Sequence, residues 1–136
     1  MDITIGEFLI SDDKELLQIE KIHDLLSRTY WAKDREIGII KHAIENSLCF
    51  GVYSEGRQVG FARCVTDYAT IYWLADVVID EEYRGRGLGK ALIGFICGYE
   101  QLSVLRGILF TDDAHGLYER YGFVRVPDEA MTRAGQ

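Results

Sequence analysis

The sequence predicts an α/β (α+β) fold, a mixed and mostly antiparallel sheet with helices, in the order β-α-α-β-β-β-α-β-α-β. Three runs rich in β-branched and aromatic residues follow one another with short connections, which indicates an antiparallel meander. The third run ends in a glycine-rich turn, and apolar residues at helical spacing follow that turn directly. A further apolar run after this helix implies a crossover and therefore one parallel strand pair.

The first half of the chain supplies a strand, two helices and the meander. Residues 3–10 are expected to form an edge strand. Asp12, with Glu15 three residues later, is typical of a capping box and predicts a helix that runs to about Arg28. Asp34 can cap a second helix, whose apolar positions are Ile37, Ile40, Ile44 and Leu48. The meander is expected at 48–54, 58–66 and 71–79, with a turn at Glu55-Gly56 in its first connection.

The second half alternates helices and strands. The expected elements are a helix at 88–102, a strand at 105–111, a helix at about 113–121 and a closing strand at 123–126. Gly122 is expected to be the C′ residue that ends the last helix, and Pro127 is expected to end the last strand. Residues 129–136 are expected to be a loose tail of a single domain that spans 1–136.

Charge and cysteine content exclude several classes of protein. The formal net charge is −7 over 136 residues, which argues against a general binder of nucleic acid or of anionic membranes. The three cysteines lack C-x-x-C spacing, so neither a zinc site nor a disulfide framework is indicated. No leader pattern and no apolar run of membrane-spanning length is visible, so we expect a cytoplasmic location.

The strand-to-helix turn has the composition of an anion-binding loop. Glycines at three alternate positions leave backbone N–H groups accessible at the positive end of the helix dipole. Arg84, Arg86 and Lys90 surround them, a local exception to the acidic composition. Neither the P-loop pattern nor the G-x-G-x-x-G dinucleotide pattern fits the spacing. The turn therefore predicts a site for another phosphate-bearing ligand.

Two motifs carry a resemblance to a known family. Arg84-Gly85-Arg86-Gly87-Leu88-Gly89 resembles the R/Q-x-x-G-x-G/A signature of the GNAT (GCN5-related) family of acyl-CoA-dependent N-acyltransferases. The segment from Ala114 to Phe123 resembles the A-x-x-L-Y-x-x-x-G-F segment of the same family. The resemblance implies a sheet with helices on both faces, acetyl-CoA as cosubstrate, an amine-bearing acceptor and no metal. It leaves a homodimer open.

The resemblance also implies a set of site residues. Backbone groups of Val77, Val78 and Ile79 would bind the pantetheine arm and the thioester, next to splayed strands. The CoA phosphates would lie on the turn, at Arg84, Gly85, Arg86, Gly87, Leu88, Gly89 and Lys90. Tyr118 occupies the general-acid position, and Tyr30 and Trp31 would line the acceptor groove. A phenol with a reference pKa of about 10 can protonate a thiolate whose conjugate pKa is about 8.5.

Some alternatives remain open from the sequence. Asp76 interrupts an apolar run near the splay, where it could act as a base or simply alternate toward a solvated face. His115 is an alternative proton relay. The favoured function is acetyl transfer from acetyl-CoA to a primary amine of a small molecule or peptide, by direct attack in a ternary complex. A CoA-binding sensor or interaction module without turnover is the alternative, and the presence of Tyr118 favours the enzyme.

Overall fold

The computed structural model describes residues 1–135. Over this range six strands form one sheet whose spatial order follows the sequence. The strands are β1 (Asp2–Ile5), β2 (Phe8–Ser11), β3 (Leu48–Ser54), β4 (Arg57–Thr66), β5 (Ile71–Ile79) and β6 (Arg106–Ile108). Neighbouring strands are antiparallel, except that β5 and β6 are parallel. The predicted mixed, mostly antiparallel sheet is therefore confirmed.

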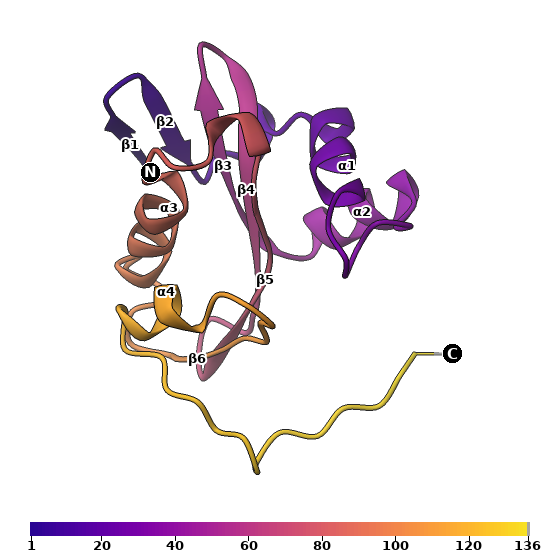
Figure 1. Cartoon of the computed structure of the whole chain (residues 1–136), viewed down its shortest axis with the longest axis vertical. Helices are drawn as coiled ribbons and strands as arrows, with labels where there is room; N and C mark the ends of the chain where they lie inside the picture. Colours follow the sequence, from indigo (N-terminus) through magenta and orange to yellow (C-terminus); the bar gives the residue numbers. More distant parts are fainter. Residues whose placement is uncertain (136) are drawn as a thin grey trace.

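The helices cover both faces of this sheet, as the family resemblance implied (Figure 1). Helices α1 (Ile19–Ser27) and α2 (Ile37–Glu45) lie on one face, and α3 (Leu88–Cys97) and α4 (His115–Glu119) lie on the other. Each long helix buries one apolar stripe. The buried positions of α3 are Leu88, Leu92, Ile93 and Ile96, which lie on one side of the helix because Leu92 follows Leu88 by four residues and Ile96 follows Leu92 and Ile93 by four and three.

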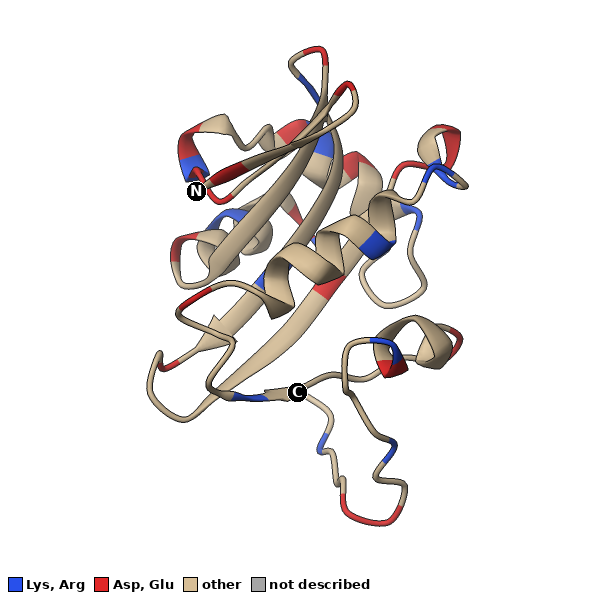
Figure 2. Ribbon diagram, turned by 90° about the vertical axis from the view of Figure 1, so that its left-hand side faces the viewer, with Lys and Arg blue, Asp and Glu red and all other residues tan. Residues whose placement is uncertain are grey.

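Side chains that alternate along the central strands divide the core between the two faces. On β4, Ala62 and Cys64 belong to the core under α3, whereas Phe61 belongs to the core under α1 and α2. Most charged residues lie in loops and at the ends of elements, and the strands carry few of them (Figure 2). None of the helices in residues 1–135 has the length and apolar character needed to cross a membrane.

The N-terminal region differs from the prediction in two ways. The expected strand at 3–10 is a hairpin of β1 and β2, because Gly6 turns the chain with a φ of +58°. The expected helix from Asp12 begins instead with a 3-10 turn, η1 (Lys14–Leu16), and continues as α1 only from Ile19. Asp13 caps that turn by accepting a hydrogen bond from the Glu15 N–H. Asp12 is paired with the N-terminal amine.

The ends of two helices and the strand after α3 also differ from the prediction. Helix α2 follows Glu36 without a side-chain cap, so Asp34 is not its capping residue, and Leu48 lies in β3. Helix α3 ends at Cys97, and the strand expected at 105–111 is limited to Arg106–Ile108.

The predicted closing strand is not part of the sheet. After Gly122 the N–H of Phe123 donates to the Tyr118 carbonyl, and the chain then leaves the body of the protein as an extended segment (Figure 1). Val124 is 81% exposed, and no strand is assigned at 123–126. The outer edge of β6 is therefore left uncovered by this segment.

Candidate active site

Two parallel strands separate next to the helix α3 and open a cleft. Strands β5 and β6 pair over three positions, the last of which joins Trp73 to Ile108. Strand β6 ends there, whereas β5 continues to Ile79. The β6-facing edge of β5 is consequently without a strand partner beyond Trp73, and its backbone polar groups need another partner. This is the splay that the family resemblance implied.

The cleft has a volume of about 590 Å³ and gathers most of the predicted site. The predicted residues that line it are Tyr30, Trp31, Val77, Val78, Ile79, Arg84, Gly85, Gly87, Leu88, Gly89 and Tyr118. Residues that sequence reasoning missed also line it, namely Arg28, Thr29, Tyr83, Asp113, Ala114 and Leu117. Leu117 and Ala114 belong to the motif that identified Tyr118, so that motif could have indicated them. Asp76, Arg86 and Lys90 do not line the cleft.

The glycine-rich turn has the geometry of an anion site at its helix end. Gly85 and Gly87 adopt φ values of +79° and +77°, which side-chain-bearing residues rarely adopt. Gly87 is the residue before α3, and the first helical hydrogen bond runs from Ala91 N–H to the Gly87 carbonyl. The N–H groups of Leu88, Gly89 and Lys90 therefore have no partner within the helix. They converge at the positive end of the helix dipole, where an anion is stabilised.

The three basic residues of the turn do not play equivalent parts. Arg84 lines the cleft. The Arg86 guanidinium is half-exposed, lies 3.6 Å from the Glu7 carboxylate and stacks over the Tyr83 ring at 5.1 Å. Lys90 is exposed on α3. Arg84 is accordingly the cation best placed to contact a ligand in the cleft.

Tyr118 is a buried aromatic residue on the wall of the cleft. It is 8% exposed, and its ring packs edge-on against Phe123 with 5.9 Å between centroids. Burial, followed by the charge of Asp113, raises the pKa of its hydroxyl to about 12. The hydroxyl therefore carries its proton throughout the neutral pH range, as a general acid must.

Tyr30 and Trp31 form an exposed aromatic pair in the connection between α1 and α2. Their ring centroids are 5.0 Å apart at an interplanar angle of 82°, and the side chains are 59% and 43% exposed. Desolvation, followed by the charge of Asp112, raises the pKa of the Tyr30 hydroxyl. Tyr30 therefore extends toward the segment between β6 and α4 that also carries Asp113.

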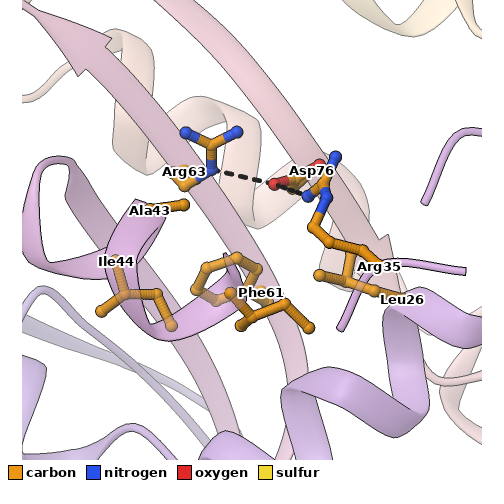
Figure 3. A pocket seen from close by; sticks show the side chains of 8 residues that line it. Leu26, Arg35, Ala43, Ile44, Phe61, Arg63 and Asp76 are labelled. Atoms are coloured by element: carbon orange, nitrogen blue, oxygen red, sulfur yellow. Dashed lines mark hydrogen bonds and ion pairs between the residues drawn. The ribbon is translucent and has the colours of Figure 1, made fainter. Parts of the chain in front are cut away.

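Asp76 lies on the opposite face of the sheet from α3 and outside the cleft. Its side chain is 3% exposed, so the expectation of a solvated position is wrong. Arg35 and Arg63 each donate to its carboxylate, at 2.7 and 2.9 Å (Figure 3). Trp31 Nε1 donates to the other oxygen at 3.0 Å. These donors engage both oxygens, and the geometry gives no support to Asp76 as a base, which stays a prediction.

The remaining candidates take no part in the cleft lining. His115 begins α4 without lining the cleft, so its role as a proton relay stays a prediction. In residues 1–135, no group of three or more His, Cys, Asp or Glu side chains is placed to hold a metal ion.

Comparisons with known proteins agree with this arrangement. Residues 45–125 match the family described as the acetyltransferase (GNAT) domain. An acetyltransferase of Gibberella zeae is 33% identical over 110 residues, which are 66% of this chain and 62% of that protein. A ycf52-like N-acetyltransferase of Prochlorococcus marinus is 32% identical over 127 residues, 88% of this chain and 69% of its own length.

A solved structure is more similar still. The crystal structure of a GNAT-family protein from Xanthomonas campestris pv. campestris superposes with a TM-score of 0.90 at 45% identity. The match covers 97% of this chain and 96% of that one. The fold and the cleft are typical of an acyltransferase, and the match over residues 45–125 identifies the family. The chain belongs to the GNAT acetyltransferase family.

Proposed function

We propose that this chain transfers the acetyl group of acetyl-CoA to a primary amine of a small molecule or peptide, by direct attack within a ternary complex. One observation carries the proposal: a single cleft contains the anion site of α3, the unpaired edge of β5 and the buried Tyr118. These three features correspond to the three needs of the reaction, which are donor binding, carbonyl polarisation and leaving-group protonation.

The donor would lie along the cleft from the glycine-rich turn to the strand edge. Its diphosphate would accept hydrogen bonds from the free N–H groups at the start of α3, with Arg84 beside them. The pantetheine arm carries amides, which can pair with the backbone edge at Val77 to Ile79 as a strand would. The thioester would then lie between this edge and α4.

The chemical step uses groups that face the cleft. The amine nitrogen bonds to the thioester carbon, the carbon–sulfur bond breaks, and the departing thiolate takes the Tyr118 proton. The proton released by the attacking amine restores the phenol, so the step is balanced. Backbone N–H groups of β5 that point into the cleft would stabilise the oxyanion that forms on the thioester oxygen.

The acceptor would enter at the opposite end, between the Tyr30–Trp31 pair and Asp113. Aromatic faces and a carboxylate both favour a cation, and the chain as a whole carries a net charge of −7. A primary amine that arrives protonated fits this end, and it would release one proton to solvent before its neutral nitrogen attacks. The phosphate-bearing donor fits the other end. The cleft would thus separate the two substrates by charge, because Arg28, which also lines it, is paired with Asp24.

Two measurements test the proposal. Acetyl-CoA should raise the melting temperature, because it binds the folded cleft and not the unfolded chain, and it should release free thiol when an amine from a panel is added. Thermal stabilisation without thiol release for any amine would favour the non-catalytic CoA-binding alternative. Absence of stabilisation by acetyl-CoA would contradict the assignment of the cleft.

A further inference from the structure

Asp76 is a buried carboxylate that contacts the aromatic wall of the cleft without reaching into the cleft itself. We propose that Asp76 is a positioning residue whose side chain holds the Tyr30–Trp31 pair on the acceptor side. The proposal rests on the proposed function for what this wall binds. The contacts of Asp76 themselves are part of the structure.

A β-bulge in β5 sets the direction of the Asp76 side chain. Strand β4 pairs Phe61 with Val78 and Arg63 with Ala75, so two residues of β5 lie opposite the single residue Ala62. Asp76, the first of the two, has a φ of +57°, a conformation that Asp tolerates better than most residues. The inserted residue shifts the strand so that Val77 and Ile79 pack with the α3 core.

The Asp76 carboxylate accepts hydrogen bonds from three donors, which come from two segments of the chain. Arg63 comes from β4, and Arg35 and Trp31 come from the connection between α1 and α2. Within this connection the Ala32 N–H donates to the Thr29 hydroxyl, and the Ala32 side chain is buried. Trp31 is 43% exposed, so its bond to Asp76 helps to fix the ring, and Tyr30 packs edge-on against that ring.

Arg63 also links Asp76 to the turn between α2 and β3. Its Nη1 donates to the hydroxyl of Ser47 in that turn at 3.2 Å. The space around these groups on the α1 and α2 side has essentially no free volume, so no ligand can occupy it. The carboxylate therefore acts through other residues and not on a substrate.

The first test removes one bond and keeps the ring. Trp31→Phe deletes the Nε1 donor but preserves edge-on packing with Tyr30. The loss of a single hydrogen bond predicts an increase of about threefold to tenfold in the KM for the amine. The Kd of acetyl-CoA should change less than about twofold, because the donor half of the cleft does not use this bond. An unchanged KM for the amine would overturn the proposal that Asp76 positions the aromatic pair.

The second test is independent of turnover. The chain has two tryptophans, so the Trp73→Phe background leaves Trp31 as the sole tryptophan, which can be excited selectively over the tyrosines. In that background Asp76→Asn should lower the anisotropy of Trp31 and increase its quenching by acrylamide. Asp128→Asn makes the same chemical change at an exposed site in the C-terminal segment and should leave both unchanged. Unaltered Trp31 fluorescence in a folded Asp76→Asn protein would overturn the proposal, whatever its activity.

The pH profile separates positioning from catalysis by Asp76. A general base would give kcat/KM a rising acidic limb that Asp76→Asn abolishes. A positioning residue would leave the shape of the profile intact and raise the KM for the amine. If Asp76→Asn does not fold, Trp31→Phe still decides the matter, because that substitution leaves the buried ion pairs in place.

Discussion

Replacing Tyr118 by Phe is the smallest change that tests the proposed general acid, because it removes only a hydroxyl. The ring stays available for its edge-on contact with Phe123. The causes that shift the pKa of this hydroxyl are burial and nearby charges, with no hydrogen bond among them. Tyr118 lines the cleft, and its hydroxyl is not a buried unsatisfied group, so deleting it should change the free energy of unfolding by less than about 1 kcal/mol.

The catalytic effect should be much larger than the effect on stability. General acid catalysis contributes about a hundredfold to ten-thousandfold, so kcat should fall by that factor while the Kd of acetyl-CoA stays near wild type. The raised pKa adds a second expectation. The alkaline limb of an acid with a pKa of about 12 lies above the pH range of ordinary assays. Tyr118 should therefore add no falling limb between pH 7 and 10, where the reference pKa of a phenol would have placed one.

Thiol release at saturating acetyl-CoA measures kcat, and titration calorimetry measures donor affinity in the same variant. A decrease in kcat below about tenfold would mean that water or His115 delivers the proton, and the acid assignment would be withdrawn. Unfolding of the Tyr118→Phe protein would show instead that the hydroxyl is needed for packing.

Further predictions concern the glycine-rich turn and alkaline stability. Gly87→Val should abolish thermal stabilisation by acetyl-CoA, because a β-branched residue is strained at a φ of +77° and disturbs the start of α3; a full shift in melting temperature would contradict the turn assignment. Arg84→Ala should weaken acetyl-CoA more than a phosphate-free pantetheine thioester, and more than Arg86→Ala does, measured by calorimetry at two salt concentrations. Equal losses for both donors would make Arg84 structural. Burial raises the pKa of Tyr118 from 10.0 to about 12, so the free energy of unfolding should fall as pH rises from about 10 to 12, by up to about 3 kcal/mol for this residue. Urea titrations across that range would contradict the pKa shift if stability stayed constant.

The glycine-rich turn and the helix after it could be predicted because their signals are local in the sequence. Gly85 and Gly87 stand where the chain needs a positive φ, and the period of α3 begins immediately after them. The meander was equally clear, since Leu48–Ser54 and Ile71–Ile79 have the predicted bounds. In contrast, the hairpin of β1 and β2 was missed, although a glycine inside an alternating run is a recognised sign of a turn or bulge.

The face of Asp76 could not be predicted, because it depends on one inserted residue in the pairing of β5 with β4. A regular strand would place Tyr72, Leu74 and Asp76 on the same face, toward α3 and the cleft. Tyr72 and Leu74 do bury there, but the bulge turns Asp76 toward α1 and α2. Such a bulge is a property of two strands together and leaves little trace in either one.

The orientation of Asp76 on the opposite face of the sheet bears on how the geometry of each half of the cleft is held. The proposed donor half consists of backbone groups at a helix start and a strand edge, which hold their geometry through secondary structure. The proposed acceptor half consists of exposed side chains on a connection, which need an anchor from outside the cleft. Turned to the opposite face, the Asp76 carboxylate can anchor Trp31 and leave Asp113 as an acidic group exposed to the acceptor.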